Sequence, residues 1–141
     1  MWILSWNVQG LGGSLCKRYK GRLRQEIQSC LLGGSLDIIM LHEHHLNEDR
    51  ISRYGSILAR QWEHFWSTRI GPLDSQGRVC ISLKVDWKPY IKEHGITLQG
   101  KAQHVILQIK EEIIGFLNIY APNRSQSRKE LWYLIANNLP V

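Results

Sequence analysis

Two kinds of hydrophobic periodicity run along the first part of this 141-residue chain. Residues 2–8 are apolar on both faces and lead into a glycine-rich stretch, which predicts a buried strand followed by a loop. In residues 18–32 apolar side chains recur every four positions with charges between them, and Gly33 follows, so we expect an amphipathic helix that ends there. Residues 37–42 predict a second strand, and residues 47–60 predict a polar helix with one apolar face.

The second part of the chain has short alternating runs separated by turn residues. These runs cover residues 64–70, 78–84, 90–96, 103–109 and 113–120. Turns between them favour antiparallel pairing of successive strands. A last amphipathic segment, residues 125–138, predicts a helix capped by Ser125 or Ser127. Strand, helix, strand, a series of strands and a helix together predict one α/β (or α+β) sandwich domain over residues 1–141.

Composition narrows the class of protein. A hydrophobic share of 43% with six tryptophans is typical of a globular chain. Cys16, Cys30 and Cys80 are an odd, widely spaced set, which argues against a disulfide framework and favours a reducing compartment. No targeting segment or membrane-length apolar run is visible, so we expect an intracellular protein with no membrane partner.

The charge favours an anionic partner. The net charge is +6 and the pI is near 9.4, as in many proteins that bind nucleic acid. Lys17 and Arg18 begin a group of five basic residues, and Arg124 begins a second, looser group. Either group is equally consistent with the solvated face of a helix.

The segment DIIMLHEHHL, residues 37–46, crowds three histidines around one glutamate. A helical zinc site would need a histidine four positions after His42, and that residue is Leu46. On an extended strand His42 and His44 would share a face, but no third ligand is evident. Zinc is therefore the disfavoured interpretation of this cluster.

Glu43 offers a second interpretation together with Asn7. Each follows an apolar strand at the point where the loop begins. If the two strands are parallel neighbours, both polar side chains emerge at the carboxyl edge of the sheet, where α/β proteins bind their ligands. Carboxylate and amide oxygens suit Mg²⁺ better than zinc. A pair of polar residues that only cap turns remains the alternative.

Three blocks of sequence resemble a known family in their order and spacing. They are SWNVQGLG at 5–12, DIIMLHE at 37–43 and GFLNIYAPN at 115–123, with GRVCIS at 77–82 and GKAQ at 100–103 similar to the intervening strands. The family is that of the endonuclease/exonuclease/phosphatase proteins, and the apurinic-type endonuclease domain of LINE (non-LTR) retrotransposons is the most similar branch. The resemblance covers essentially the whole chain and corresponds to the amino-terminal portion of such a domain.

The resemblance implies a fold and a site. The fold would be a partial, truncated four-layer α/β/β/α sandwich of the DNase I-like type. Asn7 and Glu43 would hold Mg²⁺ or Mn²⁺, Tyr120 would support the transition state at the phosphate, and Asn123 would lie along the DNA. Together with the basic residues Lys17, Arg18 and Arg124, this predicts DNA as the partner and hence a nuclear location.

The chain also departs from the family pattern. It has His42-Glu43-His44 where the family usually has Gln-Glu-Thr, and it contains neither the Gly-Asp-Phe-Asn block nor the Ser-Asp-His block that supplies the general base. The resemblance therefore implies a truncated Mg²⁺-dependent phosphodiesterase domain that is inactive alone, with exposed sheet for a partner to cover. A non-catalytic nucleic-acid-binding remnant, or the same fold acting on phosphoinositides, sphingomyelin or poly(A), remains the alternative.

Overall fold

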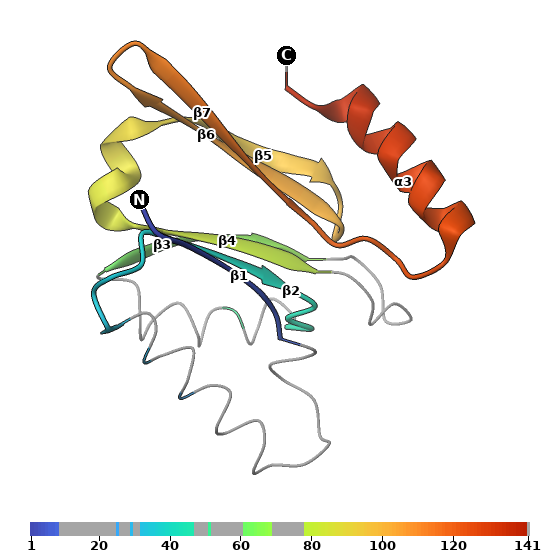
Figure 1. Cartoon of the computed structure of the whole chain (residues 1–141), viewed down its shortest axis with the longest axis horizontal. Coiled ribbons are helices and arrows are strands. Elements are labelled where there is room, and N and C mark those ends of the chain that lie inside the picture. The colour runs from blue at the N-terminus through green and yellow to red at the C-terminus, as the bar shows by residue number, and fades with distance from the viewer. Residues whose placement is uncertain are drawn as a thin grey trace.

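The computed structural model of the chain describes residues 1–8, 25, 29, 32–46, 51, 61–68 and 78–140. In this part of the chain two β-sheets stack face to face, and one α-helix lies on the outer side of the second sheet (Figure 1). The predicted α/β sandwich is therefore confirmed. No helix in the described ranges is long and apolar enough to cross a membrane.

The first sheet contains the strands β1 (Ile3–Asn7), β2 (Ile38–His42), β3 (Trp62–Ser67) and β4 (Val79–Lys84). Their order across the sheet is β1-β2-β4-β3. β1 and β2 are parallel neighbours, as the placement of Asn7 beside Glu43 requires, and the other pairs are antiparallel.

The second sheet contains β5 (Ile91–Leu98), β6 (Ala102–Ile109) and β7 (Glu112–Ile119), antiparallel and in sequence order. A 3-10 helix, η1 (Val85–Tyr90), joins β4 to β5 and carries the chain from one sheet to the other. The expected antiparallel pairing of successive strands holds for β3 with β4, β5 with β6 and β6 with β7. The expected pairing of β4 with β5 is wrong, because η1 carries the chain from one sheet to the other between them.

Apolar side chains fill three layers. The layer between the sheets holds Ile38, Ile81, Leu83, Val105 and Leu107, all fully buried. The outer face of the first sheet buries Ile39, Leu41, Trp62 and Cys80, and the outer face of the second packs on the helix. β2 and β4 are covered on both faces, which explains why their sequences are nearly continuous apolar runs.

β1 differs from the buried strand that its sequence predicted. Its residues alternate between exposed and half-buried, and Ile3 is 47% exposed. Leu4 and Trp6 pack on the outer apolar layer, whereas Ile3 and Ser5 face the side of the second sheet. The prediction of burial was wrong because β1 is the edge strand of the described sheet, and the second sheet packs mainly on β2 and β4.

The helix α3 (Ser125–Asn138) matches the predicted bounds and buries Leu131 and Ile135. The predicted cap by Ser125 or Ser127 is wrong: the N-cap is Arg124 and no side chain caps the helix. The Arg124 carbonyl accepts the first helical hydrogen bond, from the Arg128 N–H at 3.0 Å, so Ser125 is already inside the helix.

Two further helices were predicted over residues 18–32 and 47–60. Of these, Gln25, Ser29, Leu32 and Ile51 are described, and each is helical. The remainder of both segments lies outside the described residues.

Candidate active site

Asn7 and Glu43 meet where β1 and β2 end. Asn7 is the last residue of β1 and is paired with His42, so Glu43 follows directly on the neighbouring strand. The Asn7 side-chain Nδ2 donates a hydrogen bond to Glu43 Oε1 at 3.0 Å. The two side chains that the sequence selected are therefore in direct contact, 36 residues apart in the chain.

The contact depends on an unusual backbone at Glu43. Strand alternation alone would put Glu43 on the opposite face of the sheet from Asn7, because Asn7 is paired with His42. Glu43 instead has φ 55° and His45 has φ 54°, both in the left-handed region that non-glycine residues rarely adopt. Such conformations cost on the order of 1 kcal/mol and concentrate at ligand-binding sites.

Tyr120 joins the cluster from the second sheet. It follows β7, its backbone N–H donates to the Lys101 carbonyl at 2.8 Å, and its hydroxyl donates to the Glu43 carboxylate. Burial, the charge of Glu43 and this hydrogen bond all raise the pKa of Tyr120. The phenol therefore stays protonated at neutral pH and acts as a hydrogen-bond donor.

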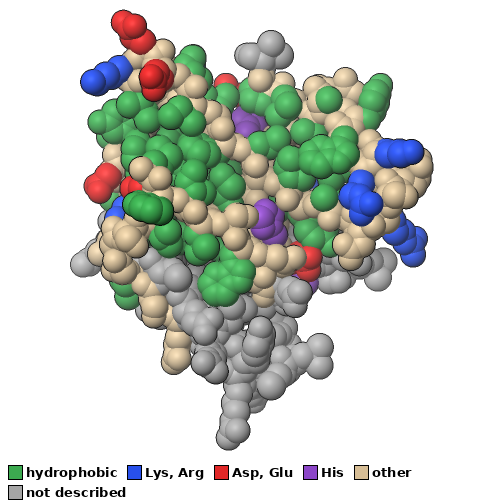
Figure 2. Space-filling view, in the orientation of Figure 1, with side chains coloured by type: hydrophobic (Ala, Val, Ile, Leu, Met, Phe, Trp, Pro, Cys, Tyr) green, Lys and Arg blue, Asp and Glu red, His purple; other side chains and the backbone are tan. Residues whose placement is uncertain are grey.

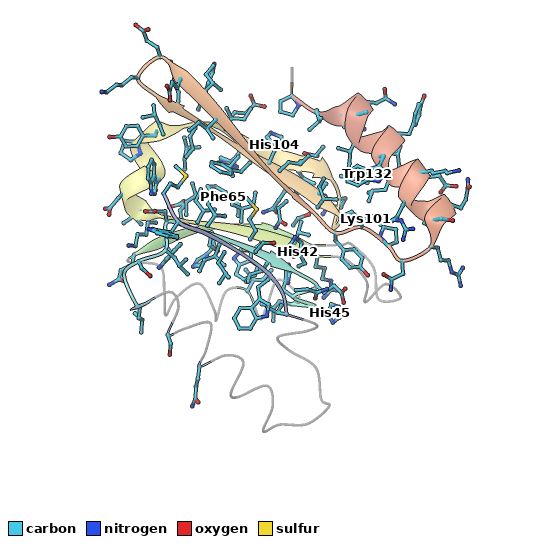
Figure 3. The ribbon with its side chains drawn as sticks, in the orientation of Figure 1. His42, His45, Phe65, Lys101, His104 and Trp132 are labelled. Atoms are coloured by element: carbon cyan, nitrogen blue, oxygen red, sulfur yellow. The ribbon has the colours of Figure 1, made fainter. Side chains whose placement is uncertain are left out.

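The second carboxylate oxygen of Glu43 is near His45. His45 Nε2 lies 3.8 Å from Glu43 Oε2, and the two side chains are 28% and 21% exposed. Figure 3 shows His42, His45 and Lys101 at this end of the sandwich. Solvent, and a hydrated ion, can therefore reach the carboxylate.

Asn118 ties the two sheets together beneath the cluster. Its buried Nδ2 donates to the Leu41 carbonyl at 3.1 Å and to the Cys80 carbonyl at 2.9 Å. These bonds hold β7, and with it Tyr120, against β2 and β4. Sequence reasoning missed Asn118, although an asparagine inside the apolar run GFLNI was a signal that a buried amide needs partners.

The histidines beside Glu43 serve packing. His44 is fully buried, its Nδ1 accepts the Leu46 N–H at 3.0 Å, and its ring packs edge-on against Trp66 with centroids 5.0 Å apart. Burial, and then the charge of Arg78, lower the pKa of His44 to about 3. Burial likewise lowers the pKa of His42. Both imidazoles are therefore neutral at physiological pH.

The geometry does not gather a zinc cage at this cluster. β2 ends at His42, so His42 and His44 do not share a strand face. In the part of the chain that the structure describes, no group of three or more His, Cys, Asp or Glu side chains lies close enough to hold a metal ion. The groups at this point are the Glu43 carboxylate, the Asn7 amide and the Tyr120 phenol, with the His45 imidazole nearby.

The residues proposed to contact nucleic acid are placed only in part. Asn123 and Arg124 are exposed between Tyr120 and the body of α3, on the same connection as the cluster. The Asn123 carbonyl accepts a hydrogen bond from Arg128 Nη1 at 2.5 Å, which fixes this turn. Lys17 and Arg18 lie outside the described residues.

Comparisons with known proteins identify the fold. No protein-family model matches the chain, and no curated protein matches it by sequence. The structure is similar to the crystal structure of the AP endonuclease LMAP from Leishmania major, with a TM-score of 0.64 and 14% sequence identity over 92% of this chain and 43% of that one. The chain thus spans less than half the length of this neighbour. Its two described sheets correspond to part of a DNase I-like fold.

Proposed function

We propose that the Asn7–Glu43–Tyr120 cluster is the metal- and phosphate-binding part of a phosphodiesterase site, in a domain related to the DNA endonucleases of LINE retrotransposons. The observation that carries this proposal is the convergence of two polar side chains, Asn7 from one sheet and Tyr120 from the other, on one strained and solvent-accessible carboxylate, Glu43. The order of the sequence blocks and the AP endonuclease-like fold support it.

The donor set fits Mg²⁺ or Mn²⁺. Glu43 and Asn7 would hold the ion through hard oxygens, with water in the other positions, as is usual for Mg²⁺. A metal there supplies neutralisation of the non-bridging phosphate oxygens and of the developing charge on the leaving oxygen. Zinc and other softer ions would prefer nitrogen and sulfur ligands, which the cluster offers only through His45.

The chain's own residues orient the Glu43 carboxylate and would contact the bound phosphate. Asn7 and Tyr120 hold the Glu43 carboxylate in one orientation through their hydrogen bonds. When a phosphate binds, the protonated Tyr120 hydroxyl would donate to one of its oxygens. Asn123 and Arg124, exposed on the connection beyond Tyr120, would follow the backbone of the DNA.

We infer that the chain binds metal and DNA without hydrolysing DNA by itself. Among the described residues Glu43 is the only carboxylate of the cluster, and the imidazole near it, His45, faces that same carboxylate at 3.8 Å. The cluster therefore has no separate carboxylate–histidine pair to activate water, and general-base catalysis is typically worth about 10²–10⁴-fold. A second candidate function is therefore a nucleic-acid-binding domain without turnover. The net charge of +6 and the exposed Arg124 favour it.

Metal binding tests the proposed site directly. Mn²⁺ titration followed by electron paramagnetic resonance should show a bound ion in the wild-type chain and none in Glu43→Gln. Glu63→Gln, which changes an exposed glutamate on β3 paired with Lys88, is the matched control and should bind as the wild type does. Equal Mn²⁺ binding by Glu43→Gln and wild type would refute the site.

DNA binding and cleavage separate the two candidate functions. Affinity for duplex DNA should fall steeply with salt, and Arg124→Ala should reduce the slope of log affinity against log salt by about one. Supercoiled plasmid incubated with Mg²⁺ should remain intact. Nicking that EDTA and Glu43→Gln both abolish would show that the chain is a complete enzyme, and salt-independent binding would contradict an electrostatic interface.

A further inference from the structure

The four residues that follow β2 alternate between the core and the surface. His44 and Leu46 are fully buried, whereas Glu43 and His45 are only partly buried. The backbone N–H of His44 donates to the Arg78 carbonyl at 3.3 Å, and its Nδ1 accepts the Leu46 N–H at 3.0 Å. Because the buried pair is anchored inward, Glu43 and His45 lie side by side toward the surface.

The backbone of this segment supports the same arrangement. Glu43 and His45 have φ values of 55° and 54°, in the left-handed region that non-glycine residues rarely adopt. Each of these conformations costs free energy, and such costs concentrate where a protein holds a ligand. Together the two strained residues bring the His45 imidazole close to the Glu43 carboxylate.

The distance between the two side chains suits a shared ion. His45 Nε2 lies 3.8 Å from Glu43 Oε2, which is too long for a direct hydrogen bond. Two atoms that each contact one divalent ion at about 2.1 Å are about 3 Å apart as adjacent ligands and about 4 Å apart as opposite ligands. The observed separation falls inside that range, so one ion can contact both atoms with little movement of either side chain.

The two oxygens of the Glu43 carboxylate have different surroundings. Oε1 accepts the hydrogen bond from Asn7 Nδ2 at 3.0 Å, whereas Oε2 is the oxygen near His45. Oε2 can therefore contact an ion while the bond from Asn7 to Oε1 stays in place. Figure 2 shows acidic and histidine side chains next to each other on the surface of this face, where water can complete the coordination shell.

We propose that His45 is a ligand of the divalent ion together with Glu43, and that the site for this reason prefers Mn²⁺ to Mg²⁺. This inference rests on the proposed function, which places an ion at Glu43. Mg²⁺ takes oxygen ligands and gives up its water reluctantly, whereas a first-row transition ion such as Mn²⁺ also accepts an imidazole nitrogen. One imidazole beside oxygen ligands does not make the nitrogen- and sulfur-rich set that zinc prefers.

A purely electrostatic role for His45 would have the opposite effect on metal binding. A protonated imidazole that only neutralised Glu43 would compete with a cation for the carboxylate, so its removal would strengthen Mn²⁺ binding. Removal of a ligand instead weakens Mn²⁺ binding and eliminates the nitrogen contact to the ion. The two roles therefore differ in the sign of the change in affinity.

Electron spin echo envelope modulation of Mn²⁺ bound to the full chain tests the proposal, because it detects a nitrogen nucleus bonded to the ion. We expect nitrogen modulation in the wild type and none in His45→Asn, although Mn²⁺ still binds to the variant. Asparagine tolerates the left-handed backbone of residue 45, so this substitution leaves the local conformation intact. His94→Gln, which changes an exposed histidine on β5, is the matched control and should retain the modulation.

Displacement of bound Mn²⁺ by Mg²⁺, followed through the resonance of free Mn²⁺, measures the preference between the two ions. His45→Asn should weaken Mn²⁺ binding at least about tenfold, a loss that is typical even of residues that only support a metal ligand. Mg²⁺ binding should change less, so a smaller excess of Mg²⁺ should displace Mn²⁺ from the variant than from the wild type. Circular dichroism verifies that each variant remains folded.

The outcomes distinguish this inference from the proposed function. If Mn²⁺ binds to the wild type and not to Glu43→Gln, but the wild type shows no nitrogen modulation or His45→Asn retains it, the role of His45 is overturned and the proposed site stands. Tighter Mn²⁺ binding by His45→Asn would also overturn that role, because it would assign His45 to charge neutralisation. A folded wild-type chain that binds no Mn²⁺ would refute the proposed site and this inference with it.

Discussion

The strand β2 has a carboxylate at each end, and the two are held in opposite ways. Asp37, before the strand, accepts the Trp2 N–H at 2.7 Å through Oδ2 and the Trp87 Nε1–H at 3.1 Å through Oδ1. The bond from Trp2 is the main cause of the lowered pKa of Asp37. Glu43, after the strand, has a left-handed backbone and lies in a cluster of side chains that converge from two sheets.

The difference teaches how to distinguish a structural carboxylate from one held for a ligand. Asp37 receives hydrogen bonds from the backbone before β1 and from η1, so it anchors local structure. Glu43 is kept in a strained conformation at an edge of the sheet where solvent reaches it. Strain persists only where the surroundings enforce it, and here the Asn118 tether and the Asn7 contact do so.

The largest expected effect is a loss of stability in acid, caused by two buried histidines. Burial lowers the pKa of His44, beside Glu43, to about 3. Burial is also the main cause of the lowered pKa of His64 in β3, which is about 4. Below pH 6.5, the ordinary pKa of histidine, these two side chains are protonated in the unfolded chain but not in the native state. The free energy of unfolding therefore decreases as the pH is lowered. Each histidine adds a slope of up to about 1.4 kcal/mol per pH unit.

Asp37 affects stability only at lower pH than the histidines do. Its lowered pKa contributes stability above its ordinary value of 3.8, and that stability is lost only as the pH falls further. Denaturant unfolding at a series of pH values should therefore show loss of stability from pH 6.5 downward, with a shallower slope in His64→Gln. An unchanged slope in that variant would contradict the assignment.

Removal of the Asn118 hydrogen bonds should weaken the contact between the two sheets near Glu43 without changing Glu43 itself. Asn118→Leu leaves the Leu41 and Cys80 carbonyls without their donor and should cost about 2–4 kcal/mol in the free energy of unfolding. Gln103→Leu, which removes one bond to the Phe65 carbonyl at 2.8 Å, is the matched control and should cost less. Chemical denaturation measures both, and equal losses would argue against a special role for Asn118.

The two carboxylates of β2 should also differ in their effect on stability. Asp37→Ala removes acceptors from the Trp2 and Trp87 N–H groups and should cost about 1–3 kcal/mol. Glu43→Gly should lower the free energy of unfolding by less than about 1 kcal/mol. Glycine adopts the left-handed backbone without strain, and this gain offsets the loss of the hydrogen bonds that the Glu43 side chain makes. Thermal unfolding of both variants tests the ranking, and a larger loss for Glu43→Gly would show that Glu43 is mainly structural.

The smallest effect is expected at a strained residue away from both carboxylates. Lys110, in the turn between β6 and β7, has φ 56°. Lys110→Gly should therefore raise the free energy of unfolding by about 0.5–1 kcal/mol and leave Mn²⁺ binding unchanged. A destabilised Lys110→Gly, measured by denaturant unfolding, would indicate that the lysine side chain has a role of its own.

Periodicity predicted those elements whose faces are decided locally. β2, β4 and α3 emerged with nearly their true bounds, because apolar runs and a helical repeat reflect burial of the element itself. The exposure of β1, the η1 crossover and the N-cap at Arg124 were not predicted. They depend on which strands lie opposite and on how the chain changes sheets.

The sequence by itself determined the α/β sandwich and placed Asn7 and Glu43 each at the end of an apolar strand, because the apolar pattern marks where a strand ends. Only the tertiary structure decided that Glu43 turns back to meet Asn7, since a left-handed residue overrides parity. Only the tertiary structure also revealed the Asn118 tether and the exposure of β1. Both arise from the stacking of sheets formed by residues far apart in the chain, which no local pattern records.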